Sequence, residues 1–128
     1  MKKEHLKIKI SELKLNTKNP KQHDDELIKS SIKDLGFVDD IIVDENNVIL
    51  SGHGRLKALQ DLGTKEVDVI RVSGWTQKQK DRYLLLSNKS VEKGGWDWEK
   101  LMENFNEQEL LKAGFGEDDL GNYWDSLK

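Results

Sequence analysis

Apolar positions along the chain recur with two different periods, and the shorter period predicts β-strands. Near the amino end, Leu6, Ile8 and Ile10 alternate with lysines, which is typical of a strand with one buried face. Two short runs of β-branched residues flank the polar segment 44–47, and this arrangement favours a hairpin. We therefore expect a sheet whose strands cover residues 6–10, 41–44, 48–50 and 67–72.

The longer period, with apolar residues three or four positions apart, predicts helices. The clearest stripe consists of Leu27, Ile28, Ile32 and Leu35, and we expect this stripe to face the core. Gly36 follows this stripe as a helix stop. Thr76 and Gln79 have the spacing of a capping box at the start of a later helix. The expected helices cover residues 24–35, 54–62 and 77–87.

A region of different composition begins after Gly94 and Gly95. Residues 92–128 carry ten acidic residues against four lysines, and three of the four tryptophans lie here. We expect two or three short helices, which either pack back on the preceding domain or form a surface for a partner or a second copy. The predicted fold class is α+β: a small mixed sheet with packed helices in residues 1–91, then an acidic, aromatic helical tail in residues 92–128.

Composition excludes several classes of protein. The chain has 128 residues and no cysteine, so it holds no disulfide, no thiolate metal site and no thiol chemistry. It contains neither an apolar run long enough to span a membrane nor the apolar stretch of a signal peptide near its amino end. These features fit a cytoplasmic location.

Charge is unevenly distributed, and this bears on DNA binding. Residues 1–23 carry seven lysines against two glutamates, whereas the net charge of the chain is −3. A domain that grips DNA unaided usually has a broad basic patch. Direct binding of duplex DNA is therefore the less favoured interpretation, and a solvated lysine surface is the simpler one.

Residues 50–59 contain the pattern with the clearest chemical meaning. An apolar strand runs into Gly52, His53 and Gly54, and a helical pattern follows at once. A glycine turn at a helix start presents backbone N–H groups to an anion, and glycines let a phosphate approach closely. Arg55 adds a planar guanidinium that matches phosphate oxygens. The alternative is that these glycines serve packing alone.

Three motifs occur in order along the chain: Asn19-Pro20-Lys21, Gly36-Phe37 and Gly52-His53-Gly54-Arg55. This order resembles the ParB/sulfiredoxin superfamily, specifically the ParB-like N-terminal (ParB-like nuclease) domains of phage and plasmid proteins and of some DNA methyltransferases. The resemblance covers roughly residues 6–91. It implies the same small mixed sheet, and nucleotide phosphates over Gly52, His53, Gly54 and Arg55.

Further site residues come from the loop and the helix before this turn. The proposed set adds Asn19, Lys21 and His23 from the loop and Ser31 from the helix. Ser31 lies four residues after Leu27, so we expect it on the inward face, either near the phosphates or bonded to the Leu27 carbonyl. His23 has the alternative of a helix-start residue without chemistry. His53 is expected to be a turn residue or a phosphate hydrogen-bond donor, and no metal site is predicted.

Departures from the family patterns limit what the resemblance implies. In sulfiredoxins the turn reads Gly-Cys-His-Arg, whereas here His53 replaces the cysteine, so their redox chemistry is excluded. Asp40 stands where the family often has proline, and Lys21 where it often has arginine. Both changes weaken the case for a CTP-switched DNA clamp.

Three functions stay open at this point. The first is a nucleotide-binding domain that acts in phage or plasmid DNA modification, packaging or partition. Such a domain would bind CTP or ATP, with Mg²⁺ as a possible companion ion. DNA or a DNA-modifying protein would be its partner, and a homodimer is compatible with this function. The second is an enzyme of the same fold, a nuclease or an ATP-dependent phosphotransferase. The third is a protein-interaction adaptor without ligand.

A nuclease would need clustered carboxylates to hold cations. The candidates near strand ends are Asp39, Asp40, Asp44, Glu45, Glu66 and Asp68. No spacing among them is diagnostic, so solvated loop acids are the favoured interpretation.

Overall fold

The computed structural model describes residues 1–19, 25–93, 95–119 and 121. It consists of an N-terminal unit, Met1–Glu92, and a C-terminal unit, Lys93–Lys128. Along the described residues, no helix is both long and apolar enough to cross a lipid bilayer.

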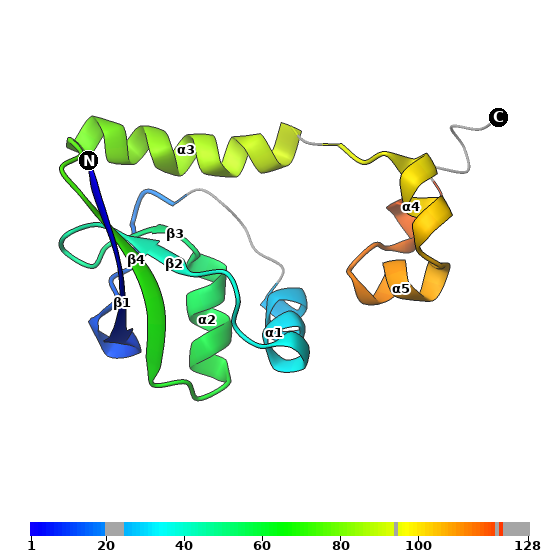
Figure 1. Cartoon of the computed structure of the whole chain (residues 1–128), viewed down its shortest axis with the longest axis horizontal. Helices are drawn as coiled ribbons and strands as arrows, with labels where there is room; N and C mark the ends of the chain where they lie inside the picture. The colour runs from blue at the N-terminus through cyan, green and yellow to red at the C-terminus, as the bar shows by residue number, and fades with distance from the viewer. Residues whose placement is uncertain (20–24, 94, 120, 122–128) are drawn as a thin grey trace. The chain divides into compact units, whose positions relative to one another are not determined.

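The N-terminal unit is built on a mixed sheet with the strand order β1-β4-β2-β3 (Figure 1). β1 (Lys2–Lys9) pairs antiparallel with β4 (Glu66–Ser73), and β4 pairs in parallel with β2 (Ile41–Val43). β2 in turn pairs antiparallel with β3 (Ile49–Ser51). The small mixed sheet expected from the sequence is thus confirmed.

β1 begins earlier than its side chains suggest. The strand starts at Lys2 rather than at residue 6, and its register with β4 runs from Lys2 opposite Ser73 to Lys9 opposite Glu66. Backbone pairing extends a strand whether or not its side chains alternate. The hydrophobic pattern therefore marks only the buried half of β1, where Ile8 packs into the core.

The core lies between the sheet and α2 (His53–Asp61), which supplies Leu56 and Leu59. Four residues of β2, β3 and β4 have 0% exposure: Ile41, Val43, Ile49 and Val69. A 3-10 turn at Ile10–Glu12 follows β1 and adds Ile10 to the same cluster.

α1 (Asp25–Leu35) packs beside α2 (Figure 1). Ile32 is partly buried against the core, but Leu27 and Leu35 are 37% and 78% exposed. The expectation that the whole apolar stripe is core is therefore wrong. Because α1 packs chiefly against α2, only part of its apolar face is covered. Gly36 does end the helix, with φ +92°.

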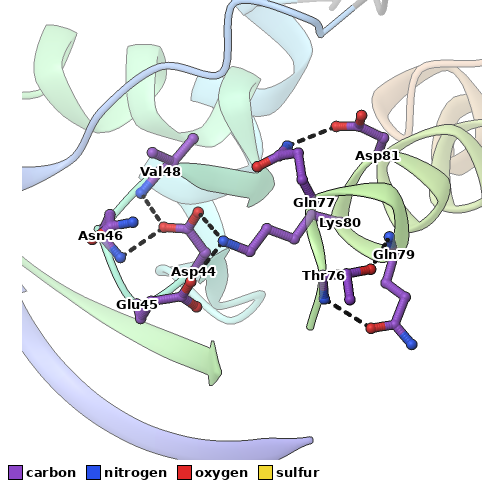
Figure 2. A network of polar contacts seen from close by, with 9 residues as sticks. All are labelled: Asp44, Glu45, Asn46, Val48, Thr76, Gln77, Gln79, Lys80 and Asp81. Carbon is purple, nitrogen blue, oxygen red and sulfur yellow. Dashed lines mark hydrogen bonds and ion pairs between the residues drawn. The ribbon is translucent and has the colours of Figure 1, made fainter. Parts of the chain in front are cut away.

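α3 (Gln77–Lys93) starts with the capping box predicted from the sequence. The Thr76 N–H donates to Gln79 Oε1 at 2.8 Å, and the Gln79 N–H donates to Thr76 Oγ1 at 3.2 Å (Figure 2). The helix continues to Lys93, beyond the expected end at residue 87. Leu84 is its most buried apolar side chain among the described residues, at 2% exposure.

The C-terminal unit contains α4 (Trp98–Asn104) and α5 (Glu107–Lys112). Asn106 and Glu109 form a capping box at the start of α5. The Phe115 ring lies edge-on to Trp96 and Trp98, with centroid distances of 4.8 and 5.8 Å. Short helices in an aromatic tail were expected, and these are found.

Candidate functional site

The strand–turn–helix arrangement predicted at residues 50–59 is present. β3 ends at Ser51, Gly52 adopts a left-handed conformation with φ +106°, and α2 begins at His53. The Leu56 N–H donates to the Gly52 carbonyl at 3.1 Å, and Gly52 has no side chain to cap the helix. The backbone N–H groups of Gly54 and Arg55 precede the first helical hydrogen bonds and point toward the position that an anion takes at a helix start.

Gly52 is required by its surroundings as well as by its conformation. A Cβ atom at this position would lie 3.1 Å from Ile41 Cγ1 and 3.3 Å from Ile41 Cα. Both contacts are tighter than ordinary packing allows, and φ +106° is itself unfavourable for other residues. The turn is therefore held directly against the start of β2.

Arg55 folds back toward the segment that precedes β2. Its Nη1 donates to the Asp40 carbonyl at 3.4 Å, and its Nη2 lies 3.9 Å from Asp39 Oδ2. The Arg55 side chain is 32% exposed and that of Asp39 is 78% exposed. An ion pair this long and this exposed contributes little, so a phosphate can compete for the guanidinium. The guanidinium is thus partly covered by the segment before β2 and partly open to solvent.

Tyr83 of α3 belongs to the same neighbourhood. Burial raises the pKa of the Tyr83 hydroxyl, and the positive charge of Arg55 acts in the opposite direction. The Tyr83 ring packs against Trp75 with a centroid distance of 5.3 Å. No pattern in the sequence indicates Tyr83, and nothing in the spacing of the chain pairs it with Arg55.

His53 turns toward the loop at residues 16–19 rather than toward open solvent. The imidazole is buried, with 9% exposure, and its Nε2 accepts the backbone N–H of Asn16 at 3.2 Å. In the same loop the Asn19 N–H donates to the Asn16 carbonyl at 3.1 Å. Lys18 Nζ reaches α3 and lies 2.9 Å from Asp81 Oδ2. The structure thus brings the loop, the glycine turn and α3 together.

The remaining predicted site residues are placed differently. Lys21 and His23 lie outside the described residues, so their roles stay predictions. Ser31 is exposed on α1. The expectation that Ser31 lies on the inward face is wrong, because α1 buries only the part of its stripe that includes Ile32. A role for Ser31 toward a phosphate stays a prediction.

Asp44 is the clearest departure from the expected picture of solvated loop acids. It is only 4% exposed, and its carboxylate accepts the N–H groups of Asn46 at 2.8 Å and Val48 at 2.9 Å (Figure 2). Lys80 of α3 donates to Asp44 Oδ2 at 3.1 Å and to Glu45 Oε1 at 2.7 Å. Hairpin and helix are joined through this lysine.

These contacts set the charge states of the cluster. Burial raises the pKa of Asp44, but the hydrogen bonds from Val48, Lys80 and Asn46 outweigh it, and the pKa falls below its ordinary 3.8. The hydrogen bond to Glu45 is the main cause of a raised pKa for Lys80. Both groups are therefore charged at neutral pH.

Lys80 could have been noticed from its position, because it lies four residues before the buried Leu84 on the same helix face. Its acidic partner could not have been inferred from sequence spacing. Within the described ranges, no group of three or more histidines or acids is arranged to hold a metal ion.

Comparisons with known proteins agree on the fold of this chain. A family model described as the ParB N-terminal domain matches residues 1–89. The ParB-like nuclease domain-containing protein YnaK of Escherichia coli K12 is 36% identical over 76 residues, which is 57% of this chain and 87% of YnaK.

Two solved structures are similar to this chain in fold. A pNOB8-like ParB N-domain superposes with a TM-score of 0.60 and 21% identity over 72% of this chain, which spans only 36% of that chain. The C-terminally truncated chromosome-partitioning protein ParB from Caulobacter crescentus, complexed with CTP-γ-S, gives a TM-score of 0.62 and 19% identity over 86% of this chain and 70% of that chain. At these identities the likeness shows the fold. Because the family model covers most of the chain and YnaK is matched over most of its own length, this chain belongs to the ParB N-terminal domain family.

Proposed function

We propose that the N-terminal unit binds a nucleoside triphosphate through the start of α2, with CTP as the first candidate. The observation that carries the proposal is the turn at Gly52, where a left-handed glycine, an uncapped helix start and the Arg55 guanidinium meet. The backbone N–H groups of Gly54 and Arg55 would hold phosphate oxygens, and Arg55 would supply the cationic contact.

The loop at residues 16–19 would form the other wall of this site. It is tied to the start of α2 through Asn16 and to α3 through Lys18, and Asn19 bonds to Asn16 in the same loop, which supports a role for Asn19 in the site. Lys21 and His23 would close the site from the continuation of this loop. Mg²⁺ would accompany the triphosphate and neutralise part of its charge.

The choice of CTP is supported by the Caulobacter crescentus ParB neighbour, which was solved with CTP-γ-S. Membership of the ParB N-terminal domain family supports a DNA-associated process, for which phage or plasmid DNA modification, packaging and partition are the candidates. We further propose that residues 1–91 carry the binding activity and that residues 92–128 provide a contact surface rather than a DNA-binding segment.

Calorimetric titration tests this proposal directly. CTP, ATP and GTP would each be titrated into the protein with and without Mg²⁺, while ¹⁵N NMR follows the amides of residues 52–56. We expect CTP to bind in the presence of Mg²⁺ and to shift these amides. Absence of binding by every nucleotide at millimolar concentration would favour the adaptor function, and release of phosphate from a bound nucleotide would favour an enzyme.

A further inference from the structure

The loop at residues 16–19 is organised around Asn16. The Asn16 side-chain oxygen accepts the Lys18 N–H at 3.1 Å, and its carbonyl accepts the Asn19 N–H at 3.1 Å. Fixing Asn16 therefore fixes the turn that carries Asn19. A side chain that holds Asn16 would control the geometry of the whole loop.

His53 makes that contact from the first residue of α2. A backbone N–H can only donate, so the Nε2 atom that it reaches must carry a lone pair, and the ring proton must sit on Nδ1. Nε2 cannot donate to a phosphate oxygen while it accepts this hydrogen bond. Its lone pair is directed at the Asn16 N–H, which requires an acceptor.

The second attachment of the loop is more exposed. Lys18 and Asp81 form an ion pair whose side chains are 57% and 34% exposed, and such pairs contribute little. The His53 imidazole is buried, with 9% exposure. The contact at Asn16 is therefore the better shielded of these two anchors.

We propose that His53 is a positioning residue: a neutral imidazole acceptor that sets the loop at residues 16–19 against the glycine turn, and whose Nε2 atom does not bind phosphate. This inference rests on the proposed function for its consequence, because the loop matters for affinity only if a nucleotide binds at the turn. The contact itself exists without any ligand.

Two measurements on the ligand-free protein test the contact. Hydrogen exchange followed by NMR should find the Asn16 amide protected, and the ¹⁵N spectrum of His53 should show a proton on Nδ1 and none on Nε2. A freely exchanging Asn16 amide, or a proton on Nε2, would overturn the proposal.

Variants test the consequence. His53→Leu removes the acceptor, so it should lose the protection of Asn16 and weaken CTP binding by roughly 2- to 12-fold, the equivalent of one hydrogen bond. His53→Gln offers an amide oxygen at a similar reach and should restore both properties to within about twofold of wild type. The matched control is His5→Leu, because His5 is an exposed histidine on β1. This variant should bind CTP like the wild type.

The outcomes separate the two proposals. Wild-type affinity in His53→Leu, or no recovery in His53→Gln relative to His53→Leu, would overturn the positioning role. A third outcome is that the wild type binds no nucleotide, while its Asn16 amide is protected from exchange and loses this protection in His53→Leu. That result would overturn the proposed function and support the anchoring contact. If His53→Leu fails to fold, His53→Gln and the wild-type exchange data still decide the question.

Discussion

Lys80 Nζ lies 3.1 Å from Asp44 Oδ2, and the two side chains are only 9% and 6% exposed. This pair joins α3 to the hairpin between β2 and β3 (Figure 2). The two charges are compensated by their mutual hydrogen bond, by the amides of Asn46 and Val48, and by Glu45. Removal of Lys80 would leave the buried Asp44 carboxylate without its cationic partner.

Lys80→Met should therefore destabilise the protein strongly. Breaking a buried pair typically costs several kcal/mol, and we expect a loss of about 3 kcal/mol in the free energy of unfolding. Urea unfolding measures this loss. Lys78→Met, an exposed lysine on the same helix, should change stability by no more than about 0.5 kcal/mol. Equal effects of the two substitutions would mean that the buried pair contributes nothing specific.

The same cluster predicts how stability depends on pH. Hydrogen bonds outweigh the effect of burial and lower the pKa of Asp44, so its stabilising contribution is present above its ordinary value of 3.8 and is lost as pH falls through the lower folded value. The pKa of Lys80 is raised, mainly by its hydrogen bond to Glu45. The stabilising contribution of charged Lys80 is therefore lost only as pH rises above 10.5.

Unfolding measured across a pH series checks this. We expect the free energy of unfolding of the wild type to fall below about pH 5, and to fall less steeply in Asp44→Asn, which has no carboxyl to protonate. Parallel curves for the two proteins would show that Asp44 is not responsible.

Gly52→Ala should lower the free energy of unfolding more than a glycine-to-alanine change at another position with positive φ. The new Cβ would meet Ile41 at 3.1 Å in a left-handed conformation, and strain and overpacking together cost about 2–4 kcal/mol. Gly63→Ala is the matched control, because Gly63 also has a positive φ of +76° but a Cβ atom added there would meet nothing within 4 Å. It should cost only about 1–2 kcal/mol.

Thermal unfolding of both glycine variants, with and without CTP, provides the measurement. Gly52→Ala should also lose the stabilisation by CTP, whereas Gly63→Ala should keep it. If both variants lose equal stability and both respond to CTP, the close approach of the turn to β2 is unimportant.

Local patterns predicted much of this fold, because strands and helices with a buried face leave a periodic signal. The alternation at Leu6 and Ile8, the capping box at Thr76 and the glycine turn at Gly52 are each encoded within a few residues. The full extent of β1 was missed because it depends on pairing with β4, which lies far away in the sequence.

The candidate site was harder to predict for the same reason. Glycines and an arginine at a helix start are a local signal, but the acceptor role of His53 depends on Asn16, which lies 37 residues away. The buried state of Asp44 likewise depends on Lys80, 36 residues away. Long-range partners of polar side chains leave no periodic trace in a single sequence.

Calorimetric titration of CTP into wild type, Arg55→Ala, Arg55→Lys and Arg82→Ala tests the central claim most directly. A guanidinium–phosphate contact contributes about 1.5–3 kcal/mol, so Arg55→Ala should weaken binding by roughly 10- to 150-fold. Arg55→Lys should recover only part of this loss, because an ammonium cannot reproduce the planar fork. Arg82→Ala, an exposed arginine on α3, should leave the affinity unchanged. Binding that survives Arg55→Ala at wild-type strength would place the phosphates elsewhere and contradict the proposed site.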